Sequence, residues 1–423
     1  MIAKNFYKLG NSIFYPQYDI GGSTEGIIPT EFPIFNYIIS LLYHVFGLNN
    51  WSGRLINWLI SCLSLYFLYG LVKKIFNKDI ALYTILLYAC SIAFMFARKT
   101  MPDTFSLSLV IIGSYYYWEY ISQTKTKHLL IAFIITSLGI LSKIPSICFL
   151  FILLFPILDK SYPIKNKIIT IISLTLSTGL VCYWYFSWMP YLELTYGNKL
   201  IWPVSLKEGF NIFKATTQEV LFRFKVTAFH YNKPYYFSLI GLLLLLKDKK
   251  INILIFFTLY SFLFFIFILK TGNIFYQHNY YVIPYIPIMA ILAAYAINKF
   301  KVIRFLPLIV VLLLIIKPIK ENRKDALAKY SYHYTRLKGI IDKLGIQDNK
   351  LMVNGDFLNP TMMYFTQEKG WSVNNNVLFK TEWMPDFKKK DGIKYIIVDR
   401  HKLEDTLVYT LIYEDDDFRV YKP

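Results

Sequence analysis

Long apolar runs separated by short polar turns alternate along most of the chain. A helix needs about 20 mostly apolar residues to cross a bilayer, within a range of about 17 to 25. On this pattern we predict ten membrane-spanning helices, three of them short. They lie near residues 51–72, 79–97, 104–121, 128–142, 145–158, 166–188, 234–246, 251–269, 279–298 and 302–317. This part of the chain is therefore expected to be an all-α polytopic membrane domain.

The fourth and fifth runs meet at the sequence SKIP, residues 142–145. One kinked helix over both runs would overshoot a single crossing, and proline disfavours helix just before it. Two helices instead place 14 basic residues in alternate turns, against four in the short turns of the other side. Those four are Arg98, Lys99, Lys143 and Lys270. Because basic loops stay in the cytoplasm, the lysine-rich side is predicted to be cytoplasmic.

Three extracytoplasmic parts follow from this orientation. Residues 1–50 form a first external loop with surface helices, and residues 51–318 form the membrane domain, with a further external loop near 189–233. Residues 319–423 read as a small soluble α/β domain. Its predicted elements are an amphipathic helix near 324–344, the strand LMVNGDF, a helix from Pro360, the strand KYIIVD and the terminal segment LVYTLIYEDDDFRVYK.

The start of the chain fits this topology poorly. Ten spans and an external C-terminus place the N-terminus outside as well. Met1 opens directly into IAKNFYKLGNSIFYPQYDIGG, which lacks the apolar stretch of a signal peptide. Either the first span translocates this tail, or a further span precedes it. We expect the second, and with it an N-terminally truncated sequence.

Composition agrees with a membrane protein. Hydrophobic residues make up 55% of the chain and charged residues 17%, and the mean hydropathy is +0.40. The net charge of +19 would suggest nucleic acid as a partner of a soluble protein, but residues 1–319 carry +17 of it. The excess is thus an orientation signal in the membrane part, and no nucleic-acid partner is expected. The four cysteines lie in apolar runs without metal-ligand spacing, as buried small hydrophobes do.

Four acidic residues of the membrane half stand out, namely Asp19, Glu25 and Glu31 in the first external segment and Asp103 in the external turn between two predicted spans. Asp103 heads a membrane helix close to Arg98 and Lys99, as a general base beside an anion site would. A plain helix cap after Pro102 explains it equally well. These acids show no recognisable metal-ligand spacing, so no divalent metal is indicated.

External cations are equally sparse. Arg98, Lys99, Lys143 and His278 sit at outer helix ends, where each is a candidate for holding a phosphate at the membrane surface. Snorkelling is the alternative. Lys143 stands out because SKIP interrupts two short helices. The segment from His278 through Tyr280 also fits an interfacial aromatic belt.

Together these segments resemble the GT-C glycosyltransferases, in particular the bacterial branch of family 39. That branch is similar to dolichyl-phosphate-mannose protein mannosyltransferases and lipid A aminoarabinose transferases. The resemblance covers nearly the whole chain. It is carried by EGIIPTEFPIFNYIISLLYHVFGLNNWSGRLINWL, RKTMPDTFSLSL, SLGILSKIPS, HNYYVIPYIPIMAILAAYAI and NPTMMYFTQEKGW.

The resemblance implies an inverting transfer of a sugar from a polyprenyl phosphate to an acceptor hydroxyl, outside a bacterial plasma membrane. The acceptor would be a glycan, a lipid or a protein, and the lipid-linked sugar is the donor, with no other cofactor indicated. By the same resemblance, Asp103 is the auxiliary acid/base or acceptor-orienting group and Asp19 the first-loop carboxylate. The expected donor-phosphate ligands are Arg98, Lys99, Lys143 and His278, and the expected acceptor or first-loop residues are Glu25, Glu31 and Tyr280.

The sequence departs from the family pattern in two places. The principal base of the family usually lies in the loop after a first span, and MIAKNFYKLG resembles the stretch just after that acid. Glu31 stands where relatives often carry a basic residue. Two other functions stay open, a transporter or flippase of lipid-linked sugars and a noncatalytic membrane subunit. Against transport, the membrane part lacks a charged pair at mid-membrane depth.

Overall fold

The computed structural model describes residues 1–20, 22, 24–199, 203–328, 332–346, 351–355, 359–380 and 392–423. The chain divides into two compact units, and each is described by itself. The helical unit comprises Glu31–Trp188 and Ile201–Ala328. The sheet unit comprises Met1–Thr30, Met189–Leu200 and Lys329–Pro423. The predicted first external loop therefore divides between the two units after Thr30.

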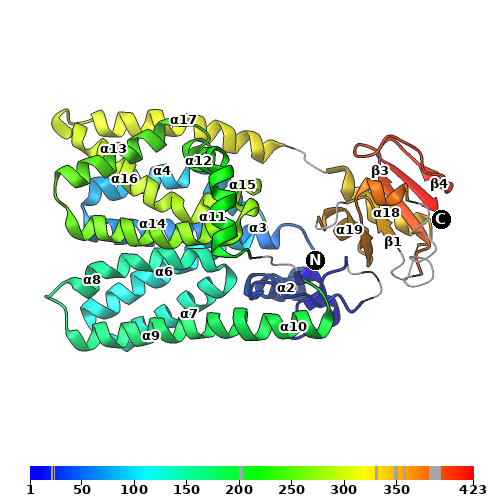
Figure 1. Cartoon of the computed structure of the whole chain (residues 1–423), viewed down its shortest axis with the longest axis horizontal. Coiled ribbons are helices and arrows are strands. Elements are labelled where there is room, and N and C mark those ends of the chain that lie inside the picture. Colours follow the sequence, from blue (N-terminus) through cyan, green and yellow to red (C-terminus); the bar gives the residue numbers. More distant parts are fainter. Residues whose placement is uncertain are drawn as a thin grey trace. The chain divides into compact units, whose positions relative to one another are not determined.

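Helices make up the helical unit (Figure 1). Up to the middle of the chain they are α2 Ile34–Phe46, α3 Ser52–Ile75, α4 Lys78–Ala89, α5 Ile92–Ala97, α6 Pro102–Gln123, α7 Thr126–Ser142, η1 Ile144–Leu153, α8 Leu154–Leu158, α9 Ile164–Tyr183 and η2 Trp184–Trp188. The later ones are α11 Leu206–Ala215, α12 Thr217–Lys225, η3 Thr227–Phe229, α13 Lys233–Lys247, α14 Ile251–Thr271, α15 Asn273–Gln277, η4 Asn279–Tyr285, α16 Ile286–Asn298, η5 Lys299–Val302 and α17 Leu306–Leu327.

Each predicted span coincides with one of these helices or with two or more consecutive ones. Within the described residues, four helices are long and apolar enough to cross a membrane. They are Ser52–Ile75, Ile164–Tyr196, Ile251–Thr271 and Asn279–Val302. The protein is thus helical and membrane-embedded, and the count of about ten crossings stays a prediction.

Helix α6 lies in the middle of the helical unit and positions the residues discussed below. It begins with Pro102 in its first turn, where proline costs no hydrogen bond, and it packs against α3, α7 and η1. Helix α7 ends at Ser142, and Lys143 has extended backbone, with φ −165° and ψ 111°. The Ser106 hydroxyl donates to the carbonyls of Gly139 at 2.6 Å and Lys143 at 3.0 Å. The predicted helix break at Lys143 is confirmed, and α6 holds it in place.

Helices α13 and α16 approach each other closely at Gly241. A Cβ atom there would lie 1.9 Å from the carbonyl oxygen of Leu292. The Ser238 hydroxyl, one turn earlier, donates to the carbonyl of Met289 at 2.8 Å. Small residues that let two backbones approach are typical of helix contacts in membranes.

We expect Gly241→Ala to destabilise the protein, because the new methyl meets backbone rather than a side chain that can rotate. Overpacking of this kind costs about 1–3 kcal/mol. Gly179→Ala in α9 is the matched control, since nothing lies within 4 Å of a Cβ there. Thermal unfolding of both variants in detergent measures the difference. Equal midpoints for the two would contradict the close α13–α16 contact.

The sheet unit contains a five-stranded sheet of order β2-β1-β3-β5-β4. Its strands are β1 Leu351–Val353, β2 Gly370–Ser372, β3 Tyr395–Asp399, β4 Thr410–Glu414 and β5 Phe418–Lys422. Strand β1 runs parallel to β2 and β3, while β5 is antiparallel to both β3 and β4. The helices of this unit are α1 Ile2–Leu9, α10 Met189–Tyr196, η6 Tyr332–Arg336, α18 Leu337–Lys343, α19 Thr361–Thr366 and α20 Asn375–Leu378. The α/β character of this part and strands within LMVNGDF, KYIIVD and the terminal segment are confirmed, although β2 was not predicted. Residues 356–357 of LMVNGDF lie outside the described residues.

Side chains on the two faces of the sheet build two apolar cores. Val353 and Ile397 point to the core that also contains residues of α18 and α19. Met352, Ile396 and Val398 point to the opposite core. This alternation follows from the two-residue period of a strand. Because an apolar core covers each face of the sheet, the residues IIV of β3 are all apolar.

The predicted helix near 324–344 is wrong as a single helix. Helix α17 ends at Leu327 and Ala328 has extended backbone, after which η6 and α18 follow as separate short elements. Residues 329–331 between them lie outside the described residues. The described residues YHYT, 332–335, are of modest helix propensity.

The N-terminal segment belongs to the same unit as the C-terminal strands. Gly370, at the start of β2, donates its N–H to the carbonyl of Asp19 and accepts from the N–H of Gly22, both at 2.9 Å. Met1 and Ile20 pack against the apolar core that contains Val353. The segment is thus an integral part of the sheet unit.

Candidate functional site

A partly buried ion pair joins the start of the helical unit to the helix break at Lys143. The Lys143 Nζ atom lies 2.5 Å from an Oε1 atom of Glu31, and their side chains are 15% and 21% exposed. Residue Glu31 stands just before α2 and Lys143 just after α7. Each charge is only partly in contact with water, so the pairing stabilises both side chains in this place.

Asp103 completes a cluster of three charges with this pair. It lies in the first turn of α6 and is 5% exposed. The charges of Asp103, Glu31 and Lys143 act on one another. The positive end of the α6 dipole favours a carboxylate at this place. We call Glu31, Asp103 and Lys143 the charge cluster. It holds two carboxylates and one ammonium group.

Aromatic side chains from η4 surround the charge cluster. The Lys143 Nζ atom lies 5.5 Å from the ring centroid of Tyr281, and the same charges act on Tyr280. The ring of His278 lies 5.1 Å from that of Tyr280 and 5.4 Å from that of Tyr281. The stretch HNYY, which sequence alone could not separate from an aromatic belt, thus borders the charge cluster.

Two cations act on His278. Burial, together with the positive charges of Lys143 and Arg223, lowers the pKa of the His278 imidazole below its usual value. The guanidinium of Arg223, on α12, donates through one nitrogen to the carbonyl of Tyr276, while its Nε atom is buried without a partner among the described residues. An imidazole on which two cations act is a favourable place for an anion.

A second unpaired polar group belongs to Tyr185. Its hydroxyl is buried and has no hydrogen-bond partner among the described residues, and the charges of Glu31, Lys143 and Asp103 act on it. Tyr185 lies in η2, a π-helical stretch that continues α9. Such stretches are frequent at functional sites. Because buried polar groups are normally paired, the Tyr185 hydroxyl and Arg223 Nε are natural contacts for a ligand.

Asn57 of α3 fixes the loop that carries Asp103. Its amide nitrogen donates to the carbonyl of Lys99 at 2.8 Å and that of Met101 at 3.2 Å. Its amide oxygen accepts from the Thr104 hydroxyl at 2.9 Å. The side chain is completely buried. One residue thus holds the loop on both sides of Asp103.

We expect Asn57→Leu to lower stability and, by releasing this loop, activity as well. Leaving buried carbonyls without a donor costs about 1–3 kcal/mol of unfolding free energy. Asn252→Leu, at an exposed position near the start of α14, is the control and should be neutral. Thermal unfolding in detergent gives the comparison, and an Asn57→Leu midpoint equal to that of the control would argue against the role of Asn57.

Arg98 and Lys99 have a different set of partners. Both bind the carboxylate of Asp325 on α17, with distances of 3.2 Å for Arg98 and 3.0 Å for Lys99. Arg98 also donates to the carbonyl of Asn322 at 3.0 Å. Two cations share one carboxylate here, so a net positive charge remains.

Asp19 and Glu25 belong to the sheet unit. The Asp19 carboxylate lies 2.6 Å from the Nζ atom of Lys4 and accepts from the side-chain amide of Asn5 at 2.9 Å. Asp19 and Lys4 are both buried, whereas Glu25 is exposed. Both oxygens of Asp19 are thus occupied by neighbours within its own unit.

Comparison with known proteins connects this geometry to a family. Residues 29–186, which include the whole charge cluster and Tyr185, match the family model described as dolichyl-phosphate-mannose-protein mannosyltransferase. The structure also matches the crystal structure of ArnT from Cupriavidus metallidurans bound to undecaprenyl phosphate, with a TM-score of 0.57 at 11% identity, over 99% of this chain and 92% of that chain. Residues 29–186 thus resemble this family, and the chain shares the fold of ArnT. The resemblance read from the sequence is confirmed.

Two curated relatives are similar to this chain in sequence. An uncharacterised protein of Aquifex aeolicus is 25% identical over 63% of this chain and 53% of its own length. The putative mannosyltransferase YkcB of Bacillus subtilis is 26% identical over 38% of this chain and 23% of its own length. The chain thus spans about half the length of the first relative and about a quarter of the second.

Several residues of this site could not be named from the sequence. Asn57, Tyr185 and Arg223 contribute through contacts with residues far away in the chain. Of the named residues, the structure brings together Glu31, Asp103, Lys143, His278 and Tyr280. The remaining four, Arg98, Lys99, Asp19 and Glu25, have the other surroundings described above.

Proposed function

We propose that the protein is an integral-membrane glycosyltransferase that transfers a sugar from a polyprenyl-phosphate donor to an acceptor hydroxyl, with inversion, on the extracytoplasmic side of a bacterial plasma membrane. The observation that carries the proposal is the charge cluster inside the segment that matches the mannosyltransferase family. The structural similarity to ArnT bound to undecaprenyl phosphate supports a lipid phosphate as the carrier.

The reaction asks for one proton acceptor and for cations where charge builds on the leaving phosphate. In our proposal the acceptor hydroxyl attacks the anomeric carbon and gives its proton to Asp103. The bond from that carbon to the phosphate oxygen breaks, and its electron pair leaves with the polyprenyl phosphate. Lys143 and Arg223 supply positive charge for the phosphate, and the imidazole of His278, on which both charges act, supplies a hydrogen bond.

Glu31, Tyr185 and Tyr280 have supporting roles in this proposal. Glu31 neutralises Lys143 while the site is empty of donor and holds its ammonium group at the helix break. The unpaired hydroxyl of Tyr185 and that of Tyr280 border the cluster and offer hydrogen bonds to the sugar or the acceptor.

Arg98, Lys99 and Asp19 take indirect roles. Arg98 and Lys99 keep a net positive charge beside Asp325, which attracts an anionic lipid without binding it directly. Asp19 is committed to Lys4 and Asn5, so we assign it a structural role in the sheet unit.

Release of free polyprenyl phosphate tests the proposal. The purified chain, reconstituted in liposomes, is supplied with polyprenyl-phosphate-linked sugars and a mixture of glycan, lipid and peptide acceptors. We expect acceptor-dependent loss of the sugar and release of polyprenyl phosphate. A flippase would instead move the lipid-linked sugar across the bilayer unchanged, and that outcome would overturn the proposal.

A further inference from the structure

The sheet unit carries a second constellation of polar side chains, at the carboxyl ends of its parallel strands. Asp399 is the last residue of β3 and Asn354 follows β1. The Asn354 amide oxygen accepts from the N–H of Asp399 at 2.8 Å, and its amide nitrogen donates to the carbonyl of Asp399 at 3.3 Å. This edge of a parallel sheet is where α/β proteins bind ligands.

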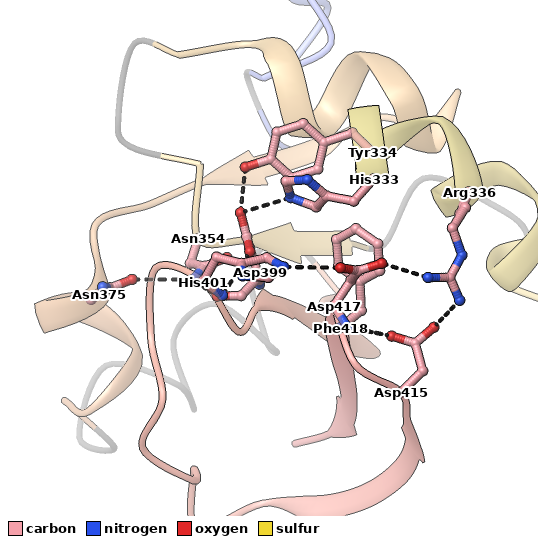
Figure 2. A network of polar contacts seen from close by, with 10 residues as sticks. All are labelled: His333, Tyr334, Arg336, Asn354, Asn375, Asp399, His401, Asp415, Asp417 and Phe418. Atoms are coloured by element: carbon pink, nitrogen blue, oxygen red, sulfur yellow. Dashed lines mark hydrogen bonds and ion pairs between the residues drawn. The ribbon is translucent and has the colours of Figure 1, made fainter. Parts of the chain in front are cut away.

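Two histidines join Asp399 at this edge (Figure 2). His333 comes from η6 and His401 from the turn after β3. One ligand atom from each of His333, Asp399 and His401 lies within 4.8 Å of the other two. Among the described residues, this is the one group of three or more histidine, cysteine or acidic side chains with such spacing. Asp399 is buried, with 2% of its side chain exposed, while His333 is 23% and His401 58% exposed.

The spacing is close to that of a tetrahedral zinc site. Zinc bonds of about 2.0–2.2 Å place ligand atoms about 3.3–3.5 Å apart. The Nε2 atom of His333 already lies 3.4 Å from Oδ2 of Asp399. The rings of His333 and His401 lie 5.0 Å apart between centroids. His401 is 58% exposed, so its side chain has room to turn toward the other two ligands.

Neighbouring groups support the ligands in the way that is typical of metal centres. The Nε2 atom of His401 lies 2.9 Å from Oδ1 of Asp417, which leaves its Nδ1 atom for an ion. The Tyr334 hydroxyl donates to Oδ2 of Asp399 at 2.5 Å. Arg336 in turn binds Asp417 at 2.5 Å. A carboxylate that accepts the second ring N–H of a ligating histidine orients the ring and raises its basicity.

We propose that His333, Asp399 and His401 bind one zinc ion, with a water molecule in the fourth position. Two imidazoles and one carboxylate suit zinc, whereas calcium and magnesium prefer oxygen ligands alone. The ion fastens η6, the first described element after α17 in the chain, to the end of β3. This site is separate from the proposed transfer reaction and does not depend on it.

Zinc binding to the purified full-length chain in detergent, after treatment with a chelator, tests this proposal. Competition with a chromophoric chelator should give one tight site per chain in the wild type. His333→Ala and His401→Ala should each lose that site, while His128→Ala, a histidine of α7, should retain it. Cobalt in place of zinc should give the absorption of a tetrahedral site in the wild type, and zinc should raise its unfolding temperature.

Two Asp→Asn variants distinguish a loss of zinc binding from a loss of folding. Asp417→Asn should weaken zinc binding about 10- to 100-fold, because it removes the carboxylate behind His401. Asp415→Asn is the matched control. Asp415 also binds Arg336, at 2.7 Å, but none of its hydrogen bonds goes to a histidine. A wild-type chain without a tight zinc site, or equal zinc affinities for Asp417→Asn and Asp415→Asn, would overturn the proposal.

Discussion

Lys143→Met is expected to lower kcat/KM for sugar transfer at least 100-fold. Lys143 is the cation that the proposed mechanism places against the leaving phosphate, and loss of one such stabilising group typically costs about 100- to 1,000-fold. The variant also leaves the partly buried Glu31 carboxylate without its 2.5 Å partner, which lowers stability as well. Initial rates of polyprenyl phosphate release, together with thermal unfolding, measure both effects.

Lys167→Met is the matched control for this variant. Lys167 is also a buried lysine of the helical unit, 7% exposed, and its ammonium group donates to the carbonyl of Asp159 at 2.5 Å. It lies in one of the turns assigned to the cytoplasmic side and should change stability without lowering kcat/KM comparably. If both variants lose activity to the same extent, the loss reflects general destabilisation and the role given to Lys143 is contradicted.

Asp103→Asn is expected to lower kcat by about 100- to 10,000-fold, with a smaller change in KM for the lipid donor. General-base catalysis contributes rate enhancements of this size, and asparagine keeps the shape of the side chain while losing the ability to take a proton. The folded structure should persist, since the amide also fits a helix first turn. A full kinetic analysis with varied donor concentration separates the two parameters.

Asp79→Asn provides the comparison for Asp103→Asn. Asp79 also lies in the first turn of a helix of the helical unit, in α4, and pairs with Lys301. Both variants therefore lose a carboxylate from the first turn of a helix, and only Asp103→Asn loses the proposed proton acceptor. Unchanged kcat in Asp103→Asn, or a similar fall in Asp79→Asn, would show that Asp103 does not accept the proton.

The helices could be predicted because their signal is local. Apolar runs of sufficient length, and lysine-rich turns between them, are properties of short segments, and the structure has helices at every predicted span. The break at Lys143 was predictable for the same reason, since Pro145 acts on the residues just before it. The prediction of one helix over 324–344 failed, because an amphipathic period is a local property. It does not reveal that Tyr334 of η6 donates a hydrogen bond to Asp399 at the end of β3.

The site was only partly predictable, because its contacts join distant segments. Sequence singled out Asp103, Lys143 and His278 as sparse external charges. It could not show that Glu31, 112 positions before Lys143, is the carboxylate that neutralises it. Arg223 gave no signal among many other basic residues. Likewise, the pairing of Gly370 with the N-terminal segment uses backbone groups, which carry no side-chain signature.

The double variant Glu31→Gln/Lys143→Met tests the central claim most directly. It removes both charges of the partly buried pair together, so no unpaired charge remains and stability should change far less than in Lys143→Met alone. The measurement is acceptor-dependent release of polyprenyl phosphate by the wild type and the double variant, at matched folded fractions. We predict release by the wild type and a loss of at least 100-fold in the double variant. Release at the wild-type rate by the folded double variant would contradict the assignment of this charge cluster as the active site.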